Sequence, residues 1–358
     1  MYGVDGRKFQ RQYKNSISNF KNWEQKSHAE DWILYPENLS GRLSLDEVAL
    51  SDGELYTVLT SKAAKGRKGS IVAVIKGTRS ETVIENLFKI NRDLRIRVKE
   101  VTLDMAGSMK LIAKKCFPNA VQVIDRFHVQ KLATEALQDI RIRYRWEAIE
   151  QENILLAEAK EKKLKPEIEI FENGDTRKQL LARSRYLLYK TREKWTASQK
   201  QRAKILFSEY TDMEKAYNLA DGLRKIYNQK IQKSVAMLKL AHWFKEVEES
   251  GFKAFSVLMK TIMNHYSDIL NYFDQRSTNA SAESFNAKIK NFRLQLRGVR
   301  DKSFFLFRLS KLFAKSPSFE TNPKCFSIVS VKNKKRILHF CKILLIKAPP
   351  AGLEPATL

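Results

Sequence analysis

Two aspartates occupy positions where the flanking residues predict β-strands. Asp46 lies inside the segment RLSLDEVAL (residues 42–50), and Asp104 lies near the end of RVKEVTLDM (residues 97–105). Aspartate is depleted in strands, and burial of an unpaired carboxylate costs free energy. A shared divalent cation would offset this cost, because it prefers oxygen ligands and leaves positions open for phosphate. An edge position facing water would explain either aspartate taken alone.

Three neighbouring acids have simpler structural explanations. Glu47 is expected on the opposite face of the strand from Asp46, because side chains alternate along a strand. Asp52 belongs to a predicted hairpin turn, where aspartate is common for conformational reasons. Asp93 lies in a predicted loop between two arginines. We therefore expect none of these three to take part in a metal site.

Glu283 is the candidate for a third carboxylate. The preceding residues 277–279 (Ser-Thr-Asn) are good helix caps, so Glu283 is expected in the first or second turn of a helix. A carboxylate near the positive end of a helix is also a common stabilising feature. Basic residues follow it at helical spacings and favour a metal site continuous with a groove for the DNA backbone: Lys288, Lys290, Arg293 and Arg297.

The overall charge points to a polyanionic partner. Sixty-six Lys and Arg residues against 40 Asp and Glu give a net charge of +26, which favours nucleic acid. No apolar run approaches the length of a membrane span, and the N-terminus does not resemble a signal peptide. The three cysteines lack the spacing of a zinc ribbon or a disulfide framework. The sequence therefore predicts a cytoplasmic, nucleoid-associated protein without a membrane partner.

The order of predicted elements indicates the fold class. Strands are expected at residues 42–50, 54–61, 70–77, 97–105 and 120–125, and helices at 80–90 and 107–117. Three strands joined by hairpins and two reached through helical crossovers form a mixed sheet covered by helices. This is the order of an RNase H-like core, although other α/β folds begin in the same way.

The remaining sequence divides the chain further. Residues 1–41 are expected to be a linker region, and residues 42–129 the first part of the core. Residues 130–274 have helical periodicity throughout and predict a large all-α insertion. Two of its helices are expected to begin with capping boxes, at Thr196 with Gln199 and at Thr211 with Glu214. Residues 275–314 predict one catalytic helix that completes the core, and residues 315–358 an atypical tail without function.

Four motifs give the chain a resemblance to a known family. LSLDE contains Asp46, VTLDMAGSM contains Asp104, VIDRFHVQKL contains Asp125 and His128, and STNASAESFNAKIK contains Glu283. Together they resemble the DDE transposases of bacterial insertion sequences. The likeness covers residues 3–314 and is greatest to the ISL-three group, in its Bacteroidetes-type branch with a separately encoded N-terminal DNA-binding region.

The resemblance implies roles for the candidate residues. Asp46, Asp104 and Glu283 would be the catalytic acids and metal ligands. They would hold Mg²⁺, with Mn²⁺ as a substitute, as two ions about 3.5–4 Å apart. Asp125 and His128 match a D-x-x-H signature whose expected role is to position DNA or to organise the site. A core histidine paired with a carboxylate or the backbone is an equally good explanation of His128.

The resemblance also implies partners. A transposase would bind double-stranded DNA at the element ends and at the target, and it would act as a homodimer because two ends must meet. Residues 1–41 contain no cysteine and only His28, so recognition of the element ends is expected from a separate DNA-binding polypeptide. The alternatives are a catalytically inactive DNA-binding relic or assembly subunit, and an RNase H-like nuclease that hydrolyses DNA without joining strands.

Overall fold

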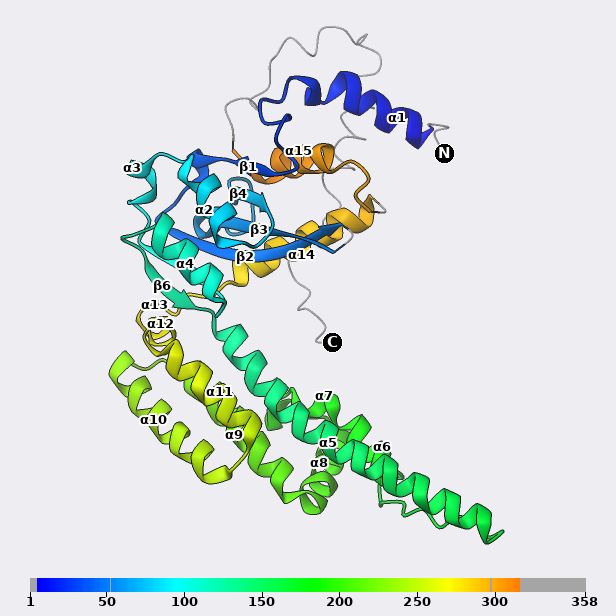
Figure 1. The fold of residues 1–358 in the computed structure, drawn as a ribbon. Coiled ribbons are helices and arrows are strands. Elements are labelled where there is room, and N and C mark those ends of the chain that lie inside the picture. Colours follow the sequence, from blue (N-terminus) through cyan, green and yellow to red (C-terminus); the bar gives the residue numbers. More distant parts are fainter. Residues whose placement is uncertain (1–4, 52, 297, 316–358) are drawn as a thin grey trace. The chain divides into compact units, whose positions relative to one another are not determined.

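A computed structural model of the chain describes residues 5–51, 53–296 and 298–315 (Figure 1). Three of the predicted features fall wholly or mainly outside this range. They are Asp52 of the predicted hairpin turn, Arg297 at the end of the predicted basic stripe, and the predicted tail, of which only Lys315 is described.

A six-stranded mixed sheet forms the core, with the strand order β1-β4-β3-β2-β5-β6. Antiparallel pairing joins β2 to β3 and β3 to β4, whereas β2–β5 and β5–β6 are parallel. The strands after the hairpins are parallel because helical crossovers precede them. The predicted RNase H-like sheet with a large helical insertion is therefore confirmed. The five predicted strands are β2 (Arg42–Ser51), β3 (Glu54–Ser61), β4 (Ile71–Lys76), β5 (Glu100–Leu103) and β6 (Val121–Ile124).

Part of the expected N-terminal linker belongs to this core. Strand β1 (Trp32–Leu34) pairs antiparallel with β4 at the edge of the sheet. The segment before it begins with helix α1 (Gly6–Gln12) and buries Phe20 and Trp23. Both rings lie 5.3 Å from the ring of Phe307, measured between centroids. The aromatic side chains thus hold the N-terminal segment against the C-terminal end of the described chain.

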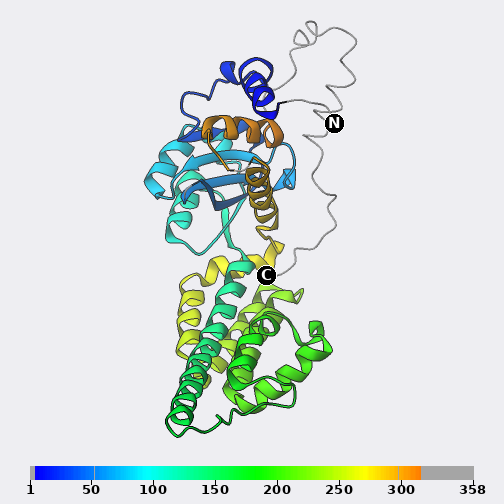
Figure 2. The ribbon, with the colours of Figure 1, turned by 90° about the vertical axis from the view of Figure 1, so that its right-hand side faces the viewer.

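Helices cover both faces of the sheet. Leu43 and Leu45 of β2 belong to a buried cluster with residues of α2 (Ser80–Phe88) and α4 (Gly107–Cys116). Short helix α3 (Arg92–Arg95) follows α2. The alternate side chains of β2 point to the other face, which α14 (Ala280–Gln295) crosses. In Figure 2 the cyan helices and the gold helix α14 lie on opposite sides of the blue strands.

The prediction of one helix within residues 275–314 is wrong, because α13 (Tyr272–Gln275) ends at the start of this range and two further helices follow it. Helix α14 ends at Gln295, and α15 (Lys302–Phe313) begins after a break. Gly298 has a φ of 104°, a left-handed conformation that interrupts a helix. The Asp301 side chain then accepts a hydrogen bond of 2.8 Å from the backbone N–H of Phe304 and so caps α15.

Residues 126–275, all of them described, contain helices and no β-strand. The capping box at Thr196 and Gln199 is present, as predicted. The box predicted at Thr211 is absent, since Tyr210 is the N-cap residue and makes no side-chain cap. None of the described helices is long and apolar enough to cross a membrane. The helices are α5 (Arg126–Glu161), α6 (Arg177–Arg183), α7 (Arg185–Leu188), α8 (Ala197–Glu209), α9 (Thr211–Asn228), α10 (Lys233–Ser250), α11 (Lys253–Asn264), α12 (Tyr266–Leu270) and α13 (Tyr272–Gln275).

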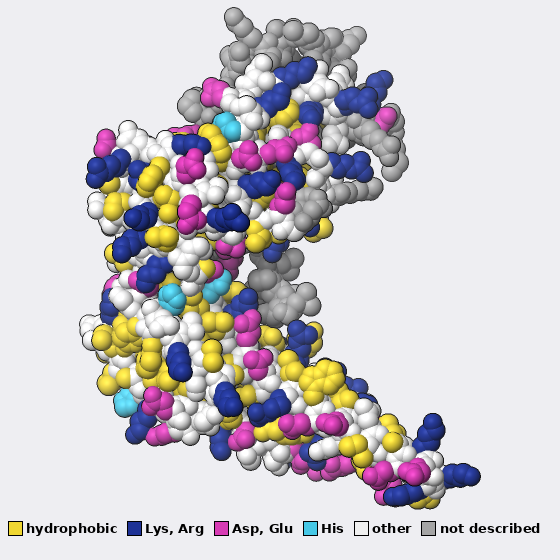
Figure 3. Space-filling model, viewed as in Figure 1, with side chains coloured by type: hydrophobic (Ala, Val, Ile, Leu, Met, Phe, Trp, Pro, Cys, Tyr) yellow, Lys and Arg dark blue, Asp and Glu magenta, His cyan; other side chains and the backbone are white. Residues whose placement is uncertain are grey.

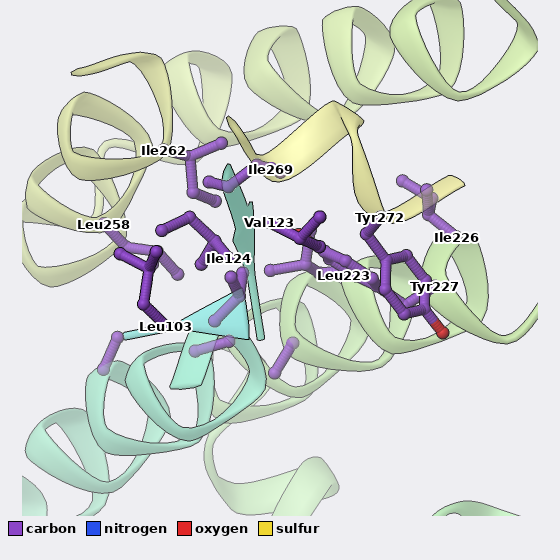
Figure 4. Close-up of a cluster of buried hydrophobic side chains, with 14 of the residues drawn as sticks. Leu103, Val123, Ile124, Leu223, Ile226, Tyr227, Leu258, Ile262, Ile269 and Tyr272 are labelled. Carbon is purple, nitrogen blue, oxygen red and sulfur yellow. The ribbon is translucent and has the colours of Figure 1, made fainter. Parts of the chain in front are cut away.

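A buried cluster joins these helices to the sheet. Figure 4 shows Leu103, Val123 and Ile124, from the ends of β5 and β6, among side chains of α9 and α11–α13. Asn271 reinforces the junction, because its Nδ2 donates a 2.9 Å hydrogen bond to the backbone oxygen of Gln122. The helical insertion is therefore packed against the carboxyl ends of β5 and β6, which the candidate acids Asp104 and Asp125 directly follow.

Candidate active site

The register between β2 and β5 brings two of the predicted acids together. Ser44 of β2 is paired with Thr102 of β5 in a parallel ladder. If the same register is continued for two residues along both strands, Asp46 lies beside Asp104. The Asp46 carboxylate points to the face that α14 crosses, where it meets Asn286, and its neighbour Asp104 follows the last residue of β5. The sequence predicted Asp46 and Asp104 as metal ligands, and the pairing of β2 with β5 brings the two residues close together.

The register between β5 and β6 adds a third acid to the same row. Leu103 is paired with Ile124, so the next residues, Asp104 and Asp125, lie side by side where the two strands end. Asp125 is also the N-cap residue of α5 and is only 1% exposed. The row thus runs across three adjacent strands, and Asp125 is an integral part of it.

Helix α14 carries Glu283 over this row. The Asn286 Nδ2 donates a hydrogen bond of 2.7 Å to Oδ2 of Asp46. Glu283 lies three residues earlier and therefore on the same side of the helix, one turn away. Its carboxylate experiences the charges of Asp46, Asp125 and His128. The long insertion thus returns the chain to the sheet with Glu283 near the acids.

Backbone groups hold the carboxylates in place. Asp46 Oδ1 accepts a hydrogen bond of 2.8 Å from the N–H of Glu47, and Asp104 Oδ1 accepts one of 2.9 Å from the N–H of Ala106. The second carboxylate oxygen of Asp125 is buried and has no hydrogen-bond partner in the described chain. A buried oxygen without a donor is costly and calls for a ligand or a proton.

The acids of this row raise the pKa of two of the candidate carboxyl groups, those of Asp46 and Glu283. Burial raises the pKa of Asp46, and the neighbouring Asp104 and Asp125 raise it further, while His128 opposes them. Glu283 is an exposed residue, but the protein around it removes part of its solvent, and this raises its pKa. The charges of Asp125 and Asp46 raise the pKa further. A like charge nearby disfavours the ionised form of a carboxyl group, so Asp46 and Glu283 are both in surroundings that oppose their ionisation.

These residues fit a hard divalent cation in their chemistry, but they do not form a closed cage. The donors are carboxylate oxygens, which Mg²⁺ and Mn²⁺ prefer. The unpartnered oxygen of Asp125 also indicates an unmet need for positive charge. Among the described residues, however, no three His, Cys, Asp or Glu side chains are grouped closely enough to hold an ion.

The predicted basic residues have different environments. Lys288 Nζ donates to the backbone oxygen of Gly66 at 2.8 Å, and Arg293 Nη1 donates to that of Leu50 at 3.1 Å. Both therefore attach α14 to the sheet region. Lys290 is exposed to solvent, and so it is the member of the described stripe best placed to meet a DNA phosphate.

A buried polar cluster beside the acids was not predicted. Lys62 Nζ donates to Oε1 of Glu100 at 3.1 Å and to Oγ of Ser277 at 2.6 Å, and it also bonds Thr102. It joins β5 to the segment leading into α14. Asn279, the N-cap residue of α14, is 1% exposed, and neither polar atom of its amide has a partner in the described chain.

No local pattern marks the members of this cluster, because they come from distant parts of the chain. Asn286, which lies outside this cluster, could have been identified as a site residue from the sequence, because it lies one helical turn after Glu283. Its side-chain amide contacts a predicted acid directly.

Comparison with known proteins identifies the family of the chain. The family model described as Transposase, that of the ISL3-type DDE transposases, matches residues 43–309. The chain therefore belongs to the ISL3 transposase family. It is 22% identical over 272 residues to the transposase for insertion sequence element IS1001 of Bordetella parapertussis, a match covering 76% of this chain and 60% of that protein. It is 25% identical over 252 residues to the transposase for IS1557 of Mycobacterium tuberculosis, covering 70% and 54%. The chain thus spans little more than half the length of these relatives.

Proposed function

We propose that this chain is the catalytic part of an insertion-sequence transposase, which cuts DNA at the element ends and joins it to a target. Asp46, Asp104 and Glu283 are the proposed catalytic acids and metal ligands. One observation carries the proposal: acids from β2, β5, β6 and α14, far apart in the sequence, come together, so that Asp104 and Asp125 raise the pKa of Asp46, and Asp125 and Asp46 raise the pKa of Glu283. Folding alone gives no reason to collect carboxylates in this way.

A divalent cation, Mg²⁺ or Mn²⁺ and by analogy with the family a pair of ions, would supply Lewis acidity and an activated water when bound by these acids. The remaining residues prepare the site. The Asn286 amide and the Glu47 N–H fix the orientation of the Asp46 carboxylate. The Ala106 N–H does the same for Asp104. Asp125 and His128 organise the row of acids from the start of α5.

DNA binding follows from the same geometry. A sugar–phosphate backbone that approaches the acids along α14 would meet Lys290. On its charge alone, Arg297 is a further proposed DNA contact. Such contacts depend on charge and not on base sequence. We further propose that the enzyme acts at the nucleoid as a homodimer. A separate polypeptide that recognises the element ends would complete the assembly.

The proposal is tested by an assay of cleavage and joining on DNA that carries the flanking element ends. Wild type and Asp104→Asn are compared in Mg²⁺, Mn²⁺ and EDTA, with any separately encoded DNA-binding partner added. Metal-dependent nicking and joining that the variant lacks would establish the transposase. Hydrolysis without joined products would identify a nuclease. Salt-sensitive DNA binding without chemistry in either protein would identify a relic or an assembly subunit.

Asn286→Ala should lower the rate of strand cleavage about 10- to 100-fold, as expected when a partner that orients a metal ligand is removed. The Mg²⁺ concentration that gives half the maximal rate should rise, while the melting temperature changes little. Asn291→Ala, at an exposed position of the same helix, is the matched control. A loss of rate that higher Mg²⁺ does not relieve at all, together with a lower melting temperature, would show that Asn286 is merely structural.

A further inference from the structure

One face of helix α5 exposes apolar side chains at regular intervals. Trp146 is 66% exposed, Ile142 40% and Leu156 39%, although all three belong to a helix of a folded unit. Together with Ile149 and Asn153 they follow one another at alternating intervals of four and three residues. We call these five residues the α5 seam.

A neighbouring side of α5, about 100° round the helix from the seam, packs on the protein. Ala148 is buried there, and Nη1 of the buried Arg141 donates a 3.0 Å hydrogen bond to the backbone oxygen of Leu181. Glu152 forms an ion pair with Lys178 of α6. The α5 seam is therefore a second apolar face, which the fold of this chain does not use.

The seam borders a shallow groove of about 490 Å³. Figure 3 shows hydrophobic side chains exposed among charged ones over the region where α5 runs. Single exposed apolar residues are normal on protein surfaces, but a continuous row is not. The groove is lined by Trp146, Ile149, Glu150, Asn153, Ile154 and Ala157.

The intervals of the seam are those of a coiled coil. In a heptad repeat the residues at positions a and d alternate by three and four. Trp146 and Asn153 occupy a positions, whereas Ile142, Ile149 and Leu156 occupy d positions. A single asparagine at an a position is the feature that selects two parallel strands in register, because it pairs with the same asparagine of its partner.

The local charges do not favour DNA and fit a second copy. Residues 142–156, the length of the seam, contain three glutamates and two arginines, so this stretch lacks the excess of positive charge that the whole chain has. In a parallel pair, Arg145 at a g position would face Glu150 at the following e position of the other copy. Opposite charges at these positions favour the pairing.

We propose that the α5 seam pairs with the seam of a second copy of this chain as a short parallel coiled coil, with Asn153 against Asn153. The proposal locates a contact of the homodimer proposed above, but it rests on the seam and not on the chemistry of the acids. Two heptads make a weak contact by themselves. DNA that holds both copies would strengthen it through effective concentration.

The first test traps the pair as a disulfide. Asn153→Cys is made in a chain carrying Cys325→Ser and Cys341→Ser, with the buried Cys116 retained. Mild oxidation with diamide should give a cross-linked dimer. The matched control is Glu158→Cys, an exposed position on the far side of the heptad, which should remain monomeric. Equal cross-linking of both variants, or of neither, would overturn the proposal.

The second test measures self-association by sedimentation, without DNA or metal, so that its outcome is independent of catalysis. Ile149→Asp should weaken the dimer about thirtyfold, as expected for a central contact residue. Leu238→Asp, at a 60% exposed apolar position of α10, should leave it unchanged. Asn153→Leu should strengthen association and admit larger oligomers. An unchanged dissociation constant for Ile149→Asp would refute the pairing, even if its affinity for DNA changed.

Discussion

Asp46→Asn should abolish strand cleavage and joining, with a loss on the order of 10³-fold or more, and should raise the melting temperature of the metal-free protein. The two effects have one cause. The Asp46 carboxylate is partly buried beside Asp104 and Asp125, and this raises its pKa. The neutral amide removes the repulsion together with the proposed metal ligand. Cleavage assays and thermal denaturation of the same preparations would measure both effects.

The Asn286 side chain should still form a hydrogen bond with residue 46 in the Asp46→Asn variant. It now donates to Asp46, and its own Oδ1 is buried without a partner in the described chain. A turn of the Asn286 amide would let that oxygen accept from the new amide. A lower melting temperature, or activity within tenfold of wild type, would show that Asp46 has a structural role.

The thermal effect of Asp46→Asn should depend on pH in a definite direction. Because the folded state raises the pKa of Asp46, it binds this proton more readily than the unfolded state does. The wild type therefore loses stability as the pH rises through the raised pKa, and the neutral variant does not. The gain in melting temperature should be near zero at about pH 3, where both states are largely protonated, and greatest at neutral pH.

Lys62→Met should destabilise the fold by about 3 kcal/mol, the usual cost of leaving a buried charge without its partner. The side chains of Lys62 and Glu100 are only 12% and 8% exposed, and Ser277 binds the same ammonium group. The substitution would leave the Glu100 carboxylate without its closest cation. Urea denaturation would measure the loss, with Lys68→Met, at an exposed position, as the control.

A double substitution distinguishes the ion pair from simple packing. In Lys62→Met with Glu100→Gln no buried charge is left unpaired, so we expect part of the lost stability to return. If the two losses simply add, Lys62 and Glu100 are energetically independent and the cluster does not hold β5 to the start of α14.

The local sequence patterns predicted most of the elements. Hairpin turns, alternating strands and the Thr196 capping box are encoded within a few residues, so each could be recognised without the rest of the chain. The errors also have local causes. The break between α14 and α15 depends on Gly298 and Asp301, which lie within an otherwise helical pattern. Strand β1 is three residues long, too short for an alternating pattern to stand out.

The candidate acids show what the sequence determined and what it left to the tertiary structure. Asp46, Asp104 and Glu283 could be selected from the sequence because each stands out from its local pattern or belongs to a motif. Their assembly depends on the register of parallel strands and on the return of α14 after a long helical insertion. Asp125 joined the row only through its pairing beside Asp104, and Lys62 met Glu100 only through packing. Contacts between distant residues arise from the global fold, and so the tertiary structure alone decided which polar groups share the site.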